Sequence, residues 1–139
     1  PIHAIDLMRF LAGSEVAEVH GACRRVFHKY KDAYSGLVYF ENGCMAHLIF
    51  NMTGTPRLER YEIHGRDISA YIEREAYVIK DGERIDIEAD DDKGTALEDR
   101  FFIECIRDGK KIDLPGANLH EAVKSMEVGH AILQRLLPT

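Results

Sequence analysis

The sequence predicts an α+β fold with an open, mostly antiparallel sheet of about 6–7 strands and helices packed on one face. About seven short runs of alternating polarity fill the middle of the chain, and helical periodicity is confined to its two ends. Strands joined in sequence by tight turns pair as antiparallel neighbours, and helices outside such a run cover one sheet face. The apolar side chains are too numerous for one face to bury, so we expect the other face to serve oligomerisation.

The first residues of the chain, 1–13, predict a short helix that ends at Gly13, a residue able to take the left-handed conformation of a helix end. Asp6 and Arg9 fall outside its apolar stripe. His3 and Asp6 are three residues apart, so we expect them to project from one helix face. The apolar stripe consists of Ile5, Met8, Leu11 and Ala12.

The second and third expected strands are joined by Asn42-Gly43. This dipeptide is typical of a type I′ turn, which requires positive φ at both of its central residues. A two-residue loop there would set Tyr39 opposite Ala46 on one face, with Val38 on the other. The expected strands are residues 16–27, 34–41, 44–52, 58–64, 68–73, 77–80 and 84–88.

Two further turns and two helices complete the expected fold. Gly65-Arg66-Asp67 and Asp81-Gly82 are expected to close the next two hairpins. The last part of the chain has helical periodicity. Thr95-x-x-Glu98 and Asn118-x-x-Glu121 have the spacing of capping boxes, and each precedes an amphipathic run.

Composition limits the possible functions. The chain has 139 residues, 45% of them hydrophobic, and a formal net charge of −6, which suits one globular domain over residues 1–139. An acidic chain is a poor partner for nucleic acid or an anionic membrane, and no apolar run approaches the roughly 20 residues that span a bilayer. The cysteines lie far apart in apolar segments and predict buried free thiols in a reducing, cytoplasmic setting. They are Cys23, Cys44 and Cys105.

No metal site is expected. His47, His64, His120 and His130 lack the close ligand spacing that a zinc site needs, so they are interpreted as surface or core residues. The acidic run Asp90–Asp92 lacks the ligand spacing and the bidentate Glu of a calcium loop, which indicates a solvated turn.

The pattern His3-x-x-Asp-Leu-x-Arg-x-Leu-x-Gly13 resembles the segment that opens the C-terminal domain of Gfo/Idh/MocA-family oxidoreductases, relatives of inositol dehydrogenase. Tyr39–Ala46 resembles a hairpin of that family, Glu62–Ile68 one of its turns, and Ala117–Ala122 the start of its closing helix. Ile68 stands where the family commonly has Gly. The resemblance covers nearly the whole chain, and it rests on the order and spacing of motifs that are individually unspecific.

The resemblance implies a two-domain enzyme in which an N-terminal Rossmann domain binds NAD or NADP and this domain supplies one wall of the substrate site. In that scheme His3 is both a catalytic and a substrate-binding residue, supporting proton transfer at the substrate oxygen. The Asp four residues before that His in the family, and any Gly-x-Gly-x-x-Gly turn, fall outside this sequence. We therefore expect no cofactor-binding residues here and no activity from this chain alone.

Two hypotheses follow. The first is the substrate-binding and dimerisation domain of an NAD(P)-dependent oxidoreductase that transfers hydride to or from a sugar, polyol or related small hydroxyl compound. The second is a stand-alone, non-enzymatic α+β module for self-association or binding of a small ligand. A homodimer or higher homo-oligomer through the open sheet face is expected. Asp6 is interpreted as a helix-face carboxylate rather than a second catalytic group.

Overall fold

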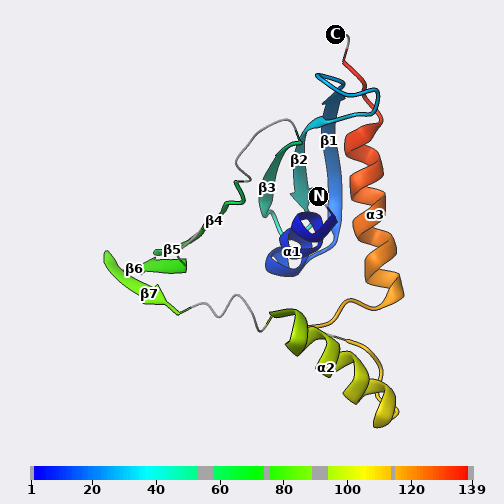
Figure 1. The fold of residues 1–139 in the computed structure, drawn as a ribbon. Coiled ribbons are helices and arrows are strands. Elements are labelled where there is room, and N and C mark those ends of the chain that lie inside the picture. Colours follow the sequence, from blue (N-terminus) through cyan, green and yellow to red (C-terminus); the bar gives the residue numbers. More distant parts are fainter. Residues whose placement is uncertain (1, 53–57, 74–75, 89–93, 114, 138–139) are drawn as a thin grey trace. The chain divides into compact units, whose positions relative to one another are not determined.

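A computed structural model describes residues 2–52, 58–73, 76–88, 94–113 and 115–137. These residues form three helices and seven strands (Figure 1). The predicted α+β class with antiparallel strands is confirmed. The strands are divided between two sheets, which lie in two compact units, Pro1–Gly54 with Ile112–Thr139 and Thr55–Lys111. Among the described residues, no helix is both long enough and apolar enough to cross a membrane.

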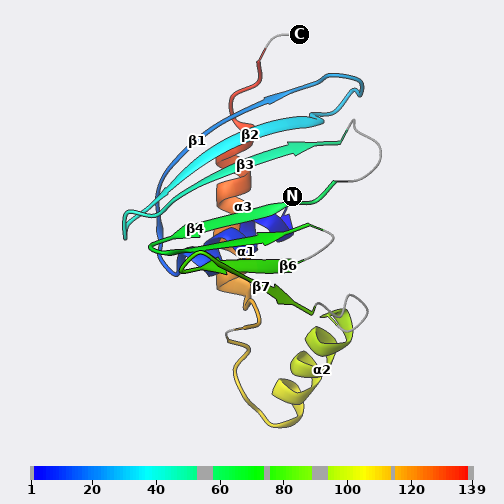
Figure 2. The same cartoon turned by 90° about the vertical axis from the view of Figure 1, so that its left-hand side faces the viewer.

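The first unit is a three-stranded sheet with two helices on one face. The strand order is β1-β2-β3, all antiparallel, and Figure 2 shows α3 passing behind these strands. Its elements are α1 (Ile2–Ala12), β1 (Val16–Arg24), β2 (Ala33–Phe40), β3 (Met45–Asn51) and α3 (Leu119–Leu133).

The core of this unit lies between the two helices and the covered face of the sheet. Burial of each such apolar side chain stabilises the fold by roughly 1.5–3 kcal/mol. Met8, Val19 and Leu48 are partly buried around the core cluster. The cluster itself consists of Ile5, Val38, Phe40, Val128 and Ile132.

A pair of glycines lets α3 approach the sheet closely. Gly21 of β1 and Gly36 of β2 are register partners, and both face Ile132. A Cβ at Gly21 would lie 2.5 Å from the Cα of Ile132, and a Cβ at Gly36 would lie 2.7 Å from its Cδ1. Any larger residue at either position would therefore push the helix or its side chain away from the sheet.

The β2–β3 hairpin differs from its prediction by one residue. Val38 pairs with Ala46, and Tyr39 with Met45, so the predicted pairing of Tyr39 with Ala46 is wrong. The loop has three residues, 41–43, and of these only Gly43 has positive φ. Because the side-chain period of a strand is two, the slip places Ala46 on the core face beside Val38 and Met45 on the other face beside Tyr39.

The physical reason for the longer loop is the side chain of Asn42. Its Oδ1 accepts a hydrogen bond from the backbone N–H of Cys44 (3.0 Å), and its Nδ2 donates to the carbonyl of Ala12 (2.9 Å). Its own backbone N–H donates to Ser14 Oγ (3.2 Å). These bonds tie the hairpin to the end of α1, and they hold Asn42 outside the positive-φ region that a type I′ loop needs.

The second unit contains a four-stranded antiparallel meander in the order β4-β5-β6-β7 and the helix α2. Asp81 and Gly82 both have positive φ, with Lys80 paired to Glu83, so the predicted type I′ turn is confirmed. The preceding turn is shorter than predicted, because Gly65 pairs with Ile68. The elements are β4 (Tyr61–Gly65), β5 (Ile68–Ile72), β6 (Ala76–Lys80), β7 (Glu83–Ile87) and α2 (Gly94–Arg107).

One face of this meander carries a row of aromatic and cationic side chains. Tyr71 and Tyr77 stack with ring centroids 5.0 Å apart, and the Arg84 guanidinium lies 4.1 Å from the Tyr77 ring centroid. His64 meets Tyr71 edge-on at 5.8 Å. Cross-strand contacts of this kind each stabilise a sheet by roughly 0.2–1 kcal/mol, and this row joins all four strands.

The helix starts agree with prediction in one case of two. Asn118 is the N-cap of α3, and its side chain accepts from the backbone N–H of Glu121, as predicted. α2 begins at Gly94, so Thr95 lies inside the first turn and is not its cap.

The prediction of buried cysteines holds for Cys23 and Cys105, whereas Cys44 is exposed beside the β2–β3 loop. The acidic run 90–92 lies outside the described residues.

We expect Gly21→Ala to lower the free energy of unfolding by about 1–3 kcal/mol or more, because the new methyl group meets the backbone of Ile132. Gly36→Ala should cost less, since the tip of the Ile132 side chain can turn away. Urea denaturation measures both losses. The control is Gly94→Ala, because the added Cβ would meet no such neighbouring atom within 4 Å. Equal losses for the first two variants would contradict this account of the packing.

Candidate functional site

The predicted catalytic residue lies at the open end of α1. His3 is in the first turn, and its side chain is exposed. Asp6, one turn further along, is half-buried between α1 and α3. Asp6 Oδ1 accepts a hydrogen bond of 2.8 Å from Ser125 Oγ on α3. Asp6 is therefore engaged in helix packing, whereas the His3 side chain is free to meet solvent or a ligand.

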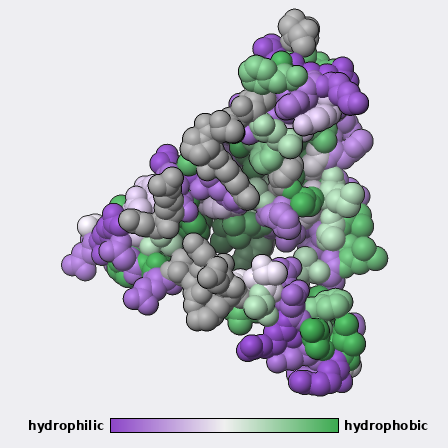
Figure 3. Space-filling view, viewed as in Figure 1, coloured by the Kyte–Doolittle hydropathy of each residue, from purple (hydrophilic) through white to green (hydrophobic). Residues whose placement is uncertain are grey.

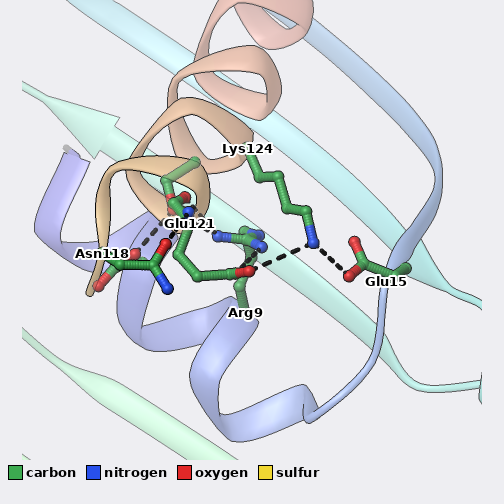
Figure 4. A network of polar contacts seen from close by, with 7 residues as sticks. Arg9, Glu15, Asn118, Glu121 and Lys124 are labelled. Carbon is green, nitrogen blue, oxygen red and sulfur yellow. Dashed lines mark hydrogen bonds and ion pairs between the residues drawn. The ribbon is translucent and has the colours of Figure 1, made fainter. Parts of the chain in front are cut away.

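Arg9 is the centre of a polar clamp between α1 and α3 (Figure 4). Its NH1 donates to Ser125 Oγ at 2.8 Å and to the backbone carbonyl of Glu121 at 2.9 Å. Its NH2 donates to Glu121 Oε2 at 2.6 Å. The Arg9 side chain is only 7% exposed, so the expectation that it lies off the buried face is wrong. A guanidinium can be buried here because several acceptors satisfy it.

Two further residues extend the clamp to the start of β1. Lys124 Nζ donates to Glu121 Oε1 at 3.3 Å and to Glu15 Oε1 at 2.5 Å. The hydrogen bond from Arg9 lowers the pKa of Glu121 below its usual value; burial opposes this effect and Lys124 adds to it. The hydrogen bond to Glu15 raises the pKa of Lys124. The clamp fixes the angle of α1 against α3, and with it the direction in which His3 is presented.

Sequence reasoning missed Arg9 and Ser125 as positioning residues. Ser125 is 1% exposed and receives and donates one hydrogen bond each within the clamp. The available signal was weak: a serine among the apolar positions of a predicted amphipathic helix, and an arginine one turn after Asp6. Only the packing of α1 on α3, which are 112 to 119 positions apart, brings them together.

A second organised region is the connection between β1 and β2. The Asp32 side chain is fully buried, and its carboxylate accepts from the backbone N–H groups of Val26 (2.7 Å), Phe27 (2.9 Å) and His28 (2.9 Å). Burial raises the pKa of Asp32, but these hydrogen bonds outweigh it and hold the pKa below its usual value. Capture of these N–H groups also explains why β1 ends at Arg24 and not at the predicted residue 27.

The predicted surface histidines take part in local contacts. His47 Nε2 lies 3.3 Å from Ser35 Oγ, and His64 Nδ1 lies 2.9 Å from Ser69 Oγ. His120 and His130 are exposed on α3. The described residues hold no group of three or more His, Cys, Asp or Glu side chains arranged for a metal ion.

We expect Glu121→Gln to destabilise the fold by about 1–3 kcal/mol at pH 7, because Arg9 loses its charged partner. The pKa of Glu121 is depressed in the folded state, so its stabilising effect is present above about pH 4.5, its usual pKa, and is lost as the pH falls through the folded value. The gap between wild type and variant should therefore close in acid. Urea denaturation from pH 7 to pH 3 measures it, with exposed Glu127→Gln as control. A gap that does not depend on pH would contradict the charge argument.

The comparisons with known proteins agree with this fold. UDP-N-acetylglucosamine 3-dehydrogenase from Acidithiobacillus ferrooxidans matches with 17% identity and a TM-score of 0.80, over 94% of this chain and 45% of that one. Aldose-aldose oxidoreductase from Caulobacter crescentus matches with 18% identity and a TM-score of 0.78, over 94% of this chain and 42% of that one. Biliverdin reductase from Synechocystis matches with 17% identity and a TM-score of 0.74, over 94% of this chain and 43% of that one. At these identities the likeness shows the fold, and this chain spans less than half the length of each of these proteins.

A comparison with curated protein sequences found no significant match. The sequence profile of the GFO/IDH/MocA C-terminal domain matches residues 2–71, which is half of the chain and includes α1, the whole three-stranded sheet and all but the last residue of the first hairpin of the meander. The predicted resemblance is thereby confirmed, and the chain belongs to the C-terminal domain of the GFO/IDH/MocA oxidoreductase family.

Proposed function

We propose that this chain is the substrate-binding and self-association domain of an NAD(P)-dependent oxidoreductase acting on a sugar, polyol or related hydroxyl compound. The observation that carries the proposal is His3, the residue of the family motif, exposed on a helix whose angle is fixed by the Arg9 clamp. Two of the similar structures are named as enzymes of sugar compounds, a UDP-N-acetylglucosamine dehydrogenase and an aldose-aldose oxidoreductase.

His3 is assigned to the proton at the substrate oxygen. Oxidation of a carbinol removes a proton from its oxygen and a hydride from its carbon, and histidine is well suited to moving protons near neutral pH. A bound nicotinamide cofactor would supply the hydride acceptor. The sequence contains no Gly-x-Gly-x-x-Gly turn, so no residue of this chain is assigned to the dinucleotide.

Exposed apolar side chains on the outer side of α3 support the proposal that another domain packs against this helix. Leu119, Val123 and Met126 follow one another at helical spacing and are 82%, 45% and 65% exposed. Figure 3 shows hydrophobic surface over part of α3. A helix with apolar side chains on both sides is typical of an element packed between two layers, and a nucleotide-binding domain would provide the second layer. The free thiols of Cys23, Cys44 and Cys105 suit a cytoplasmic enzyme.

We further propose that the helix-free face of the β1–β3 sheet mediates self-association. The observed register places Leu37, Tyr39, Met45 and Ile49 on that face, and the last two are 67% and 73% exposed. Apolar side chains on an open sheet face are a common basis of two-fold interfaces, because one pairing buries both copies of the face.

In the intact enzyme, we expect the His3→Ala substitution to lower turnover by roughly 10²–10⁴-fold, the usual contribution of a general acid or base. The free energy of unfolding should change little, because the side chain is exposed. Steady-state kinetics and a thermal melt measure the two effects. His120→Ala, an exposed histidine of α3, is the matched control. Turnover of the His3→Ala enzyme within a few-fold of wild type would refute the assigned role.

Light scattering of this chain at micromolar concentration should report about twice the chain mass of 15.8 kDa. Ile49→Glu should shift the mass to that of a monomer, because the carboxylate would be buried without a partner in the proposed interface. The control is Met126→Glu, which places the same charge on an exposed residue of α3. A wild-type monomer that melts cooperatively would show that the sheet face is not an association surface.

A further inference from the structure

The connection between β1 and β2 concentrates positive charge in an acidic protein. Residues 24–32 contain four of the 18 Lys and Arg residues and a single acidic residue, Asp32, although the chain carries a net charge of −6. The tail after α3 runs beside this connection, because the backbone N–H of Cys23 donates to the carbonyl of Arg135 at 2.8 Å. The cations gathered here are Arg24, Arg25, Lys29, Lys31 and Arg135.

These cations lack the carboxylate partners that several other basic residues of the chain have. Arg9 and Lys124 bind Glu121, and Arg60 binds Glu73 at 2.7 Å. In the part of the chain that the structure describes, none of the five cations gathered here forms an ion pair with a carboxylate. Unpaired cations brought close together repel one another, so an anion placed among them would be stabilised.

The backbone of this connection is held in one shape before any ligand arrives. Asp32 accepts from three successive backbone N–H groups, and the side chain of Tyr34 donates to the carbonyl of Lys31. Lys31 Nζ in turn donates to the carbonyl of Leu133 at the end of α3 (2.5 Å). A loop fixed in this way loses little conformational entropy on binding, which favours recognition of a small group.

Apolar and aromatic side chains stand among the cations. Val26 and Phe27 are 49% and 75% exposed, and the His28 and Tyr30 rings stack at 4.8 Å. Such side chains lower the local dielectric constant beside a bound anion and so strengthen its ion pairs.

This connection lies at the same end of the first unit as His3. α1 and α3 run in opposite directions, since Arg9 contacts Glu121 whereas Ile5 packs against Gly129. The start of α1 therefore points toward the end of α3, where Lys31 binds Leu133. Figure 2 shows the β1–β2 connection at the edge of this unit opposite the β2–β3 hairpin.

We propose that the β1–β2 connection binds a phosphate group of the substrate, so that the hydroxyl compound handled at His3 is a phosphate-bearing sugar or polyol. The role of His3 in this statement rests on the proposed function, whereas the phosphate site rests on the loop alone. A phosphate offers several strong acceptor oxygens to Arg25, Lys29 and their neighbours. The area of one loop suits a small anion better than a protein partner, which would cover roughly 800 Å². The acidic remainder of the chain would repel nucleic acid and anionic membranes.

The test is a calorimetric titration of this chain with inorganic pyrophosphate at low salt, compared with uncharged glucose. We expect one site for pyrophosphate and none of similar affinity for glucose. The double variant Arg25→Gln/Lys29→Gln should weaken pyrophosphate binding by about tenfold or more. The matched control is Arg66→Gln/Lys80→Gln, which removes two exposed cations from the second unit and should leave binding unchanged. Thermal melts verify that both variants remain folded.

A second arm separates the possible sources of the phosphate. In the intact enzyme, the loop variant should raise KM for the phosphate-bearing substrate by about tenfold and leave KM for the dinucleotide unchanged. A rise in KM for the dinucleotide alone would overturn the proposal in favour of a cofactor site. Absence of pyrophosphate binding, or equal weakening in the control variant, would also overturn it. Loop-dependent pyrophosphate binding together with normal turnover of His3→Ala would instead leave the phosphate site standing and remove the proposed function.

Discussion

Contact between α3 and the sheet through Gly21 and Gly36 is the constraint on which the first unit depends. Ile132 sits on this glycine pair at distances that leave no room for a Cβ, so α3 lies closer to β1 and β2 than larger residues would allow. That approach completes the core around Val38 and lets the tail after α3 pair with β1 at Cys23. Since interiors are close-packed, a small displacement of α3 would be transmitted to α1 and to the loop after β1.

The polar clamp turns this packing into a defined geometry at the start of α1. Apolar contacts are non-directional and would tolerate rotation of α1 about its axis. The bonds from Arg9 to Glu121 and Ser125, and from Ser125 to Asp6, are directional and each needs a specific angle. Arg9 would cost free energy if buried alone, so it favours the single arrangement in which its acceptors are present.

Charge is distributed unevenly over this unit, and the two regions use carboxylates in opposite ways. In the clamp, the carboxylates of Glu121 and Glu15 neutralise the charges of Arg9 and Lys124. At the β1–β2 connection the one carboxylate, Asp32, is buried and satisfied by backbone N–H groups, so it is not available to pair with the surrounding cations. The loop is therefore both rigid and locally positive, which is the combination that recognition of a small anion requires.

The sequence by itself determined the α+β class, the family, the Asn118 cap and the Asp81-Gly82 turn, because each depends on neighbouring residues or on periodicity. Only tertiary structure decided the β2–β3 register. The Asn-Gly dipeptide favours one loop, but hydrogen bonds from Asn42 to the end of α1 select another, and a one-residue slip exchanges the faces of the strand. Tertiary structure also decided the burial of Arg9 and Ser125. Their partners lie more than a hundred residues away in the sequence, a separation at which local patterns carry no information.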